Sequence, residues 1–301
     1  MTVLRELADR YLAIRRGLGY QLKIEGRMLG QFVGDCDARG LDHVTVAAAL
    51  QWATAPAGAA TSWWAARLTV IREFARFAAA FDNRTEVPPT DLLPRTAGDR
   101  IQPYLYSPAQ ISALLKAARD LAHPLRAATF EAFIGLMATT GIRTGEAMGL
   151  DRDDVDLAQG TLVIRGSKFG KSRLVPLHAT TVEHLGVYRR QRDQLCPSPA
   201  TAAFFVSSAG SRLNSCSTSK AFTRILKTAA IRAPAGTAKP RLYDLRHTFA
   251  VTTMTRWYAT EADVAHLLPA LSTYLGHISP ATTYWYYSDS RVIPMPAPSC
   301  S

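Results

Sequence analysis

Apolar residues at positions 1–90 recur at the spacing of helices. Near the N-terminus one apolar face is interrupted by arginine and aspartate, and it consists of Leu4, Leu7, Tyr11 and Ile14. Similar spacing predicts helices over about residues 22–33, over residues 46–52 and after Ser62. We therefore expect a compact all-helical unit at this end of the chain.

The helix after Ser62 carries an apolar stripe along its length. The stripe consists of Trp64, Leu68, Ile71, Phe74, Ala78 and Phe81. Arg72, Glu73 and Arg76 lie off this stripe, so the pattern places them outside the predicted buried face.

The periodic pattern stops at 91–103, where prolines, a glycine and charged residues replace it. This composition predicts a linker there, with the helical unit at 1–90 and a second unit at 104–301. The second unit opens with Ser107 and Pro108, a pair that is typical of the first turn of a helix.

The second unit combines helices with one short β hairpin. An apolar helical pattern covers residues 125–139 and ends at Gly141, and a short helix is predicted at 144–150. Residues 161–165 and 172–177 then predict two strands joined by a glycine-flanked turn. The expected fold class is mainly α with a small antiparallel β hairpin or sheet, as a helical N-terminal domain followed by an α+β domain.

Positive charge is concentrated in one block of the chain. The 301 residues carry a net charge of +11. Residues 1–100 hold 13 lysines and arginines against 11 aspartates and glutamates, whereas residues 165–246 hold 15 against 3. Such a block suits a polyanion, most simply the backbone of a nucleic acid. A solvated basic face without a partner is the alternative, and we disfavour it because the block lies among the motifs described next.

The remaining composition argues against several classes of protein. The four cysteines are scattered, with no C-x-x-C pair, so neither a zinc site nor a disulfide framework is expected. The charged N-terminus does not resemble a signal peptide, and no uncharged apolar stretch is long enough to span a bilayer. We expect a cytoplasmic protein with no metal, no cofactor and no membrane partner.

Four fragments of the second unit carry residues suited to chemistry on a phosphate. Taken singly, each has a simpler explanation, such as a surface ion pair, a charged hairpin tip, a buried histidine or an aromatic core cluster. Their combination is more informative than any one of them. The fragments contain Arg143 with Glu146, Lys168 in the hairpin turn, Arg246 with His247 at a helix start, and His277 before a group of tyrosines.

The chemistry that this combination suits is phosphoryl transfer at a phosphodiester. Two arginines can clamp the charged oxygens of the pentavalent transition state, and histidines can add hydrogen bonds. A tyrosine can attack the phosphorus while a lysine protonates the leaving oxygen. Cationic side chains would then stabilise the charge that a metal ion stabilises in other phosphoryl-transfer enzymes. This agrees with the lack of a carboxylate cluster suited to Mg²⁺ in the sequence.

The ordered set of motifs resembles the tyrosine recombinase (phage integrase) family, whose signature is Arg, Lys, His-x-x-Arg, His or Trp, and Tyr. In that family the nucleophile usually lies nine residues after the later histidine, which selects Tyr286; Tyr284 and Tyr287 are out of register, and Tyr287 is the alternative. The resemblance implies a core-binding domain that grips DNA at 1–90 and a catalytic domain at 104–301. It implies catalytic roles for Arg143, Lys168, Arg246, His277 and Tyr286.

The resemblance also implies supporting residues. Glu146 stands at the position of the acidic residue that supports the arginine pair, and His247 is a candidate helper in proton transfer. Tyr243 replaces the histidine that usually precedes the second arginine by three residues, and its phenol can still donate a hydrogen bond. Lys171 is the alternative to Lys168, three residues later. The candidate DNA contacts are Lys171, Arg173, Arg72 and Arg76.

The function implied is that of a site-specific DNA recombinase or integrase that cleaves and rejoins strands through a 3′-phosphotyrosyl intermediate. Its expected partner is double-stranded DNA, bound by a homo-tetramer in the cytoplasm near the nucleoid. The alternatives are a type IB topoisomerase-like enzyme and a DNA-binding protein that has lost catalysis. The DNA-binding protein without catalysis is favoured by three prolines near the C-terminus, Pro294, Pro296 and Pro298. They forbid the C-terminal helix with which many family members dock on a neighbouring protomer.

Overall fold

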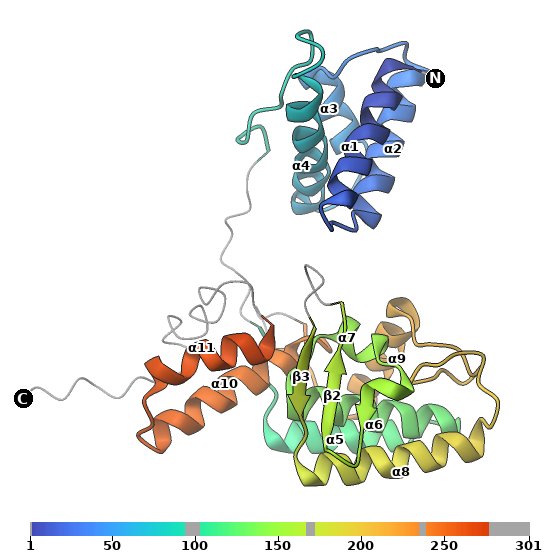
Figure 1. Cartoon of the computed structure of the whole chain (residues 1–301), viewed down its shortest axis with the longest axis vertical. Coiled ribbons are helices and arrows are strands. Elements are labelled where there is room, and N and C mark those ends of the chain that lie inside the picture. The colour runs from blue at the N-terminus through green and yellow to red at the C-terminus, as the bar shows by residue number, and fades with distance from the viewer. Residues whose placement is uncertain (1, 94–102, 167–171, 235–238, 277–301) are drawn as a thin grey trace, which may run out of the picture. The chain divides into compact units, whose positions relative to one another are not determined.

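The computed structural model describes residues 2–93, 103–166, 172–234 and 239–276. It divides the chain into two compact units, Met1–Ile101 and Gln102–Ser301, and the division lies inside the segment predicted as a linker. The fold class is confirmed, since the described residues are mainly helical and include one small antiparallel sheet (Figure 1). Among these residues, no helix is both long and apolar enough to cross a membrane.

In its described part, the N-terminal unit consists of four helices around one apolar core. The predicted periodicity accounts for all four, although α2 extends further than the pattern indicated. Leu29, Phe32, Leu68 and Phe74 are completely buried between them. The helices are α1 Val3–Gly17, α2 Lys23–Ala38, α3 Val46–Thr54 and α4 Thr61–Ala78.

Arginine burial in α4 corrects the prediction for Arg72. The residue is only 8% exposed, and its guanidinium donates hydrogen bonds to the carbonyls of Pro88 (2.7 Å) and Pro89 (2.8 Å). Arg67 is also buried; it lies 3.6 Å from the ring centroid of Trp52 and donates to the carbonyl of that residue at 2.7 Å. Periodicity counts arginine as polar, but its stem packs like an apolar side chain once carbonyls accept its protons.

The other burial predictions for this helix are confirmed in part. Leu68, Ile71 and Ala78 are buried as expected. Phe81 lies beyond the end of α4 and is 50% exposed, so its assignment to the buried stripe was wrong. Arg76 is exposed as predicted and pairs with Glu73.

The second unit surrounds α6, which packs against α5, α8 and α10. Phe133 and Met137 of α6 are completely buried, and Phe133 meets Phe205 edge to face at 5.2 Å. Ser107 and Gln110 cap α5 reciprocally, which confirms the predicted helix start. The helices are α5 Pro108–Arg119, α6 Pro124–Thr140, α7 Thr144–Gly149, α8 Ala179–Leu195, α9 Ser215–Thr228, α10 Asp244–Ala259 and α11 Val264–Leu275, with a 3₁₀ turn at Arg152–Asp154.

The small sheet lies beside α7 in Figure 1. Strands β2 (Thr161–Ile164) and β3 (Arg173–Pro176) form the predicted antiparallel hairpin, in which Ile164 is opposite Arg173. A third strand, β1 (Val155–Asp156), pairs with β2 on its other side. The sequence did not predict β1, because a strand of this length has too few residues to show an alternating pattern.

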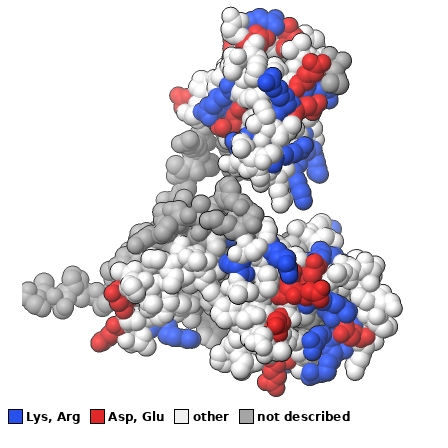
Figure 2. Space-filling model, in the orientation of Figure 1, with Lys and Arg blue, Asp and Glu red and all other residues white. Residues whose placement is uncertain are grey.

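The basic block at 165–246 is partly neutralised by carboxylates that precede it in the chain. Arg165 pairs with Asp154, and Arg212 pairs with Asp151. On the face drawn in Figure 2, lysines and arginines of this unit accordingly alternate with acidic side chains. The count of charges along the sequence therefore overstates the positive potential that this block presents.

We predict that the two arginines of α4 differ in their contribution to stability. Arg72→Ala leaves the carbonyls of Pro88 and Pro89 without this hydrogen-bond donor and creates a cavity in the core. The free energy of unfolding should therefore fall by about 2–3 kcal/mol. Arg76→Ala, the matched control on the same helix, should change it by less than about 0.5 kcal/mol. Denaturant unfolding of the purified variants measures both values, and equal effects would contradict the assignment of Arg72 to the core.

Candidate active site

Arg246 joins three helices at the centre of the second unit. It lies in the first turn of α10 and is completely buried. Its Nη1 donates to the carbonyl of Gly141 at 2.8 Å, and its Nη2 donates to the carbonyl of Leu275 at 2.7 Å. Gly141 ends α6 with a φ of 62°, and a Cβ there would lie 2.5 Å from the ring of Phe249. Glycine is therefore required for the turn that presents this carbonyl.

Arg143 stands at the N-terminus of α7 and is held by Glu146. Its backbone N–H donates to Glu146 Oε2 at 2.9 Å, and its Nη1 donates to Oε1 at 2.7 Å. The side chain is 25% exposed, and its Nη2 donates to the carbonyl of Gly276 at 2.6 Å. The contact between Arg143 and Glu146 that the sequence predicts is thus present.

The second arginine that binds Glu146 is Arg173 on β3. The family resemblance had implied that Glu146 supports Arg143 and Arg246. Arg173 Nη1 and Nη2 donate to Glu146 Oε1 and Oε2 at 3.0 and 2.7 Å, and its Nε donates to the carbonyl of Tyr274 at 2.9 Å. Its side chain is 12% exposed. Its guanidinium nitrogens thus donate to protein oxygens, although its charge and its place after the hairpin turn had made Arg173 a candidate DNA contact.

The end of α11 brings these three side chains together, and we call Arg143, Arg173 and Arg246 the arginine cluster. The last carbonyls of a helix have no partner within the helix, and they form the negative end of its dipole. Guanidinium groups that donate hydrogen bonds to these carbonyls therefore stabilise this end of the helix. The carbonyls of Tyr274, Leu275 and Gly276 accept from Arg173, Arg246 and Arg143 respectively.

Gly276 shapes this helix end and is the glycine of the L-G-H motif. Its φ is 68°, and a Cβ would lie 2.8 Å from Nη1 of Arg173 and 3.3 Å from Nη1 of Arg143. A residue with a side chain would strain the backbone and would collide with the arginines. The next residue in the chain is His277, so the arginine cluster holds the point where the chain enters the predicted nucleophile segment.

Electrostatics keep Glu146 ionised in this environment. Burial raises the pKa of Glu146. Hydrogen bonds from Arg173 and from the backbone and side chain of Arg143, together with the charge of Arg173, outweigh burial and lower the pKa to about 2. The cluster thus combines three positive charges with one negative charge at neutral pH. The remaining positive charge suits a phosphate group.

His247 has a different environment from that of the arginine cluster. Burial lowers its pKa to about 4, so the imidazole is neutral at neutral pH. Its ring meets that of Tyr243 edge to face at 5.0 Å. Tyr243 is 39% exposed at the start of α10. A neutral imidazole can exchange a proton, which is the role that the sequence suggested for His247.

Several predicted residues lie outside the described part of the chain: Lys168, Lys171, His277, Tyr284, Tyr286 and Tyr287. The structure therefore brings together Arg143, Glu146 and Arg246, and it adds Arg173. Within the described ranges, no group of three or more histidine, cysteine, aspartate or glutamate side chains could hold a metal ion.

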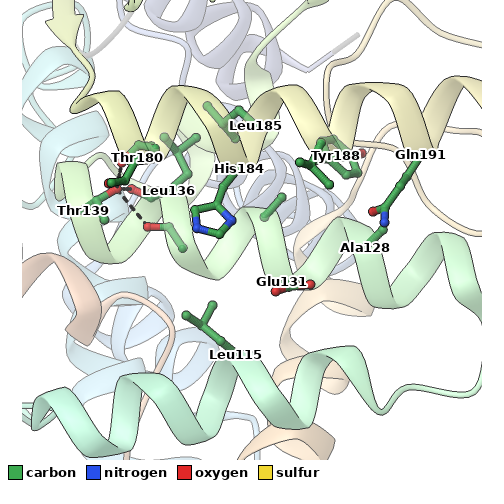
Figure 3. Close-up of a pocket in the computed structure, with 14 residues that line it drawn as sticks. Leu115, Ala128, Glu131, Leu136, Thr139, Thr180, His184, Leu185, Tyr188 and Gln191 are labelled. Carbon is green, nitrogen blue, oxygen red and sulfur yellow. Dashed lines mark hydrogen bonds between the residues drawn. The ribbon is translucent and has the colours of Figure 1, made fainter.

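A separate hollow of about 300 Å³ lies between α5, α6 and α8. Figure 3 shows His184 of α8 directed toward α6, where Glu131 lies beneath it, with Leu115 of α5 opposite. The lining is otherwise largely apolar, and it includes no member of the arginine cluster. This hollow is thus a different place from the candidate active site.

Comparison with known proteins decides the family. The model of the phage integrase family matches residues 105–291, which include the whole arginine cluster. The chain belongs to the phage integrase family. It is a tyrosine recombinase, an enzyme that breaks and rejoins DNA strands.

Individual relatives agree with this assignment. A Sinorhizobium fredii protein named as an integrase/recombinase, y4rB, is 42% identical over 296 residues, which cover 96% of this chain and 94% of y4rB. The tyrosine recombinase XerD of Ralstonia nicotianae is 32% identical over 226 residues, or 75% of this chain and 68% of XerD. Among solved structures, the Tn1549 transposon integrase in complex with transposon right end DNA shares the fold, with a TM-score of 0.66 at 18% identity over 96% of this chain and 95% of that one.

We predict that acid weakens the fold through Glu146. The folded-state pKa of about 2 lies below the ordinary value of 4.5, so the contribution of Glu146 is complete above about pH 4.5 and is lost as the pH falls toward 2. Wild type should lose roughly 2–3 kcal/mol of its stability advantage over Glu146→Gln across that range. Unfolding curves from pH 5 to pH 2.5 test this, with Glu183→Gln on the exposed face of α8 as control. A constant difference between wild type and Glu146→Gln would contradict the prediction.

We also predict that Gly276→Ala disrupts catalysis beyond its effect on stability. The left-handed backbone alone should cost about 1–2 kcal/mol, and the added methyl group displaces Arg173 and Arg143. Gly160→Ala is the matched control, because Gly160 has a φ of 61° and a Cβ would meet Val182 at an ordinary 3.4 Å. Both variants should lose stability in thermal unfolding, but only Gly276→Ala should cleave bound DNA more slowly. Equal cleavage by the two variants would show that Gly276 matters only for folding.

Proposed function

We propose that the chain is a site-specific DNA recombinase that cleaves its target through a covalent 3′-phosphotyrosyl intermediate at Tyr286. The observation that carries the proposal is the arginine cluster at the end of α11. Two of its members, Arg143 and Arg246, are the arginines that the family signature selects, and both are fixed by protein oxygens before any DNA is bound. Donors that are already oriented lose little free energy by reorganising as charge develops in the transition state.

The proposed reaction is an in-line displacement at the scissile phosphate. The oxygen of Tyr286 forms a bond to phosphorus as the bond from phosphorus to the 5′ oxygen breaks. Lys168 delivers a proton to that oxygen. The proton lost by Tyr286 passes to solvent, and solvent reprotonates Lys168, so the number of protons is unchanged. Arg143, Arg246 and His277 bind the non-bridging oxygens. Attack by the 5′-hydroxyl of a partner strand reverses the step, and the covalent bond conserves the energy of the phosphodiester.

The partner that we propose is double-stranded DNA, with a homo-tetramer acting on two sites and the N-terminal unit gripping the duplex. Support for DNA comes from the family and from its solved members. The recombinase XerH, with a TM-score of 0.62 at 20% identity over 83% of this chain and 70% of that one, was crystallised on its difH substrate after cleavage. Arg76 and Lys171 remain candidate DNA contacts. We no longer propose Arg72, which donates to the carbonyls of Pro88 and Pro89, or Arg173, because each of its three guanidinium nitrogens donates to a protein oxygen.

We predict that wild type forms a covalent adduct with DNA and that Tyr286→Phe does not. The substrate is duplex DNA from either side of the protein's own gene, nicked so that the cleaved strand diffuses away and the intermediate accumulates. A denaturing gel separates the adduct from free DNA. Tyr284→Phe and Tyr287→Phe are the matched controls and should retain the adduct.

Each other result of this experiment has a defined meaning. An adduct that persists in Tyr286→Phe but disappears in Tyr287→Phe would move the nucleophile by one residue. Tight, salt-sensitive binding without an adduct in any variant would favour a DNA-binding protein that has lost catalysis. Resealing of a single duplex without strand exchange between duplexes would favour a topoisomerase-like activity.

A further inference from the structure

Arg173 is the member of the arginine cluster that the family signature does not include. Each of its three guanidinium nitrogens already donates to a protein oxygen: two to Glu146 and one to the carbonyl of Tyr274. Its donors are thus directed into the protein, and a role as a simple DNA contact does not fit.

The pairing with Glu146 links Arg173 to a residue of the signature. Both oxygens of Glu146 are shared, so that each accepts from a nitrogen of Arg173 and from a nitrogen of Arg143. Fork-to-fork pairing of this kind fixes the plane of the carboxylate. The orientation of Arg143 therefore depends on Arg173, although the two guanidinium groups do not exchange hydrogen bonds.

The charge of Arg173 has a second effect on the site. Glu146 orients Arg143 but also cancels its positive charge, which weakens the attraction of the pair for a phosphate. Arg173 adds one positive charge to the same carboxylate, so the group of three retains a net charge of +1. In a half-buried site, where water screens weakly, this difference is large enough to affect a bound anion.

The contact with Tyr274 links Arg173 to the end of α11. Its Nε donates to that carbonyl at 2.9 Å, and its guanidinium occupies the space that a side chain at Gly276 would need. β3 is also the strand that follows the predicted Lys168 turn in the chain. Arg173 thus connects three parts of the proposed machinery: Arg143, the hairpin and the helix end that leads to His277.

We propose that Arg173 is a positioning residue for DNA cleavage. It orients Arg143 through Glu146 and holds the end of α11, and it does not itself contact the scissile phosphate. The inference rests on the proposed cleavage by Tyr286 and deepens it.

The test compares Arg173→Met and Arg173→Lys with Arg165→Met. Arg165 follows β2 in the same hairpin, is exposed and pairs with Asp154 instead of Glu146, so it is the matched control. The measurements are the single-turnover rate of adduct formation on the nicked DNA at saturating protein, the DNA affinity as a function of salt, and the unfolding temperature. Cleavage is measured well below the unfolding temperature of every variant.

The expected result separates rate from affinity. Arg173→Met should form the adduct about 10²-fold more slowly, with an affinity and a salt dependence close to those of wild type and Arg165→Met. Arg173→Lys should recover part of the rate, because an ammonium group can still pair with Glu146 but cannot also reach Tyr274. Partial rescue by lysine at similar stability is not expected of a residue that serves folding alone.

Three outcomes would overturn the inference. A decrease of about one in the salt slope for Arg173→Met would assign the residue to a DNA phosphate. An unchanged cleavage rate at a lower unfolding temperature would make it purely structural. Absence of the adduct with wild type would remove the proposed function and this inference together, whereas a wild-type adduct with an equally fast Arg173→Met would remove the inference alone.

Discussion

The C-terminal end of α11 is where the second unit of this integrase is held together. Three consecutive carbonyls there each accept a hydrogen bond from a different arginine, and the arginines come from α7, β3 and α10. Guanidinium groups this close repel one another. The partial negative charge of the helix end and the ionised Glu146 offset that repulsion. The same arrangement gives the site its positive charge and fixes the residue from which the chain continues to His277.

Two glycines make this arrangement possible. Gly141 and Gly276 end α6 and α11 in the left-handed conformation, and each turns a carbonyl oxygen toward an arginine of the signature. Side chains at either position would collide with Phe249 or with the guanidinium of Arg173. The glycines in the T-G-I-R and L-G-H motifs therefore have a physical explanation: they place acceptors for arginine side chains, and they provide room for the arginine cluster.

Much of the fold followed from local patterns in the sequence. Periodic apolar positions identified the helices, the pair Ser107 and Pro108 marked the start of α5, and glycines bounded the hairpin. The contact between Arg143 and Glu146 was also predictable, because the residues lie three apart at the start of a short helix. These features depend on neighbours within one or two turns of the chain.

The features that were missed depend on distant neighbours. Arg173 meets Glu146 across 27 residues and Tyr274 across 101 residues, and Arg72 meets Pro88 across 16 residues. Nothing in the local pattern distinguishes these arginines from exposed ones, since the periodic count treats every arginine as polar. Their burial depends on carbonyls that only the tertiary fold places beside them.

The arginines are oriented before DNA binds, by the end of α11 and by Glu146. The most direct measurement is a crystal structure of Tyr286→Phe bound to duplex DNA that contains the cleavage site. We expect Arg143 and Arg246 to bind the scissile phosphate while they keep their hydrogen bonds to the carbonyls of Gly276 and Leu275. Guanidinium groups that leave these carbonyls to bind the phosphate would show that DNA builds the site, and would contradict the account.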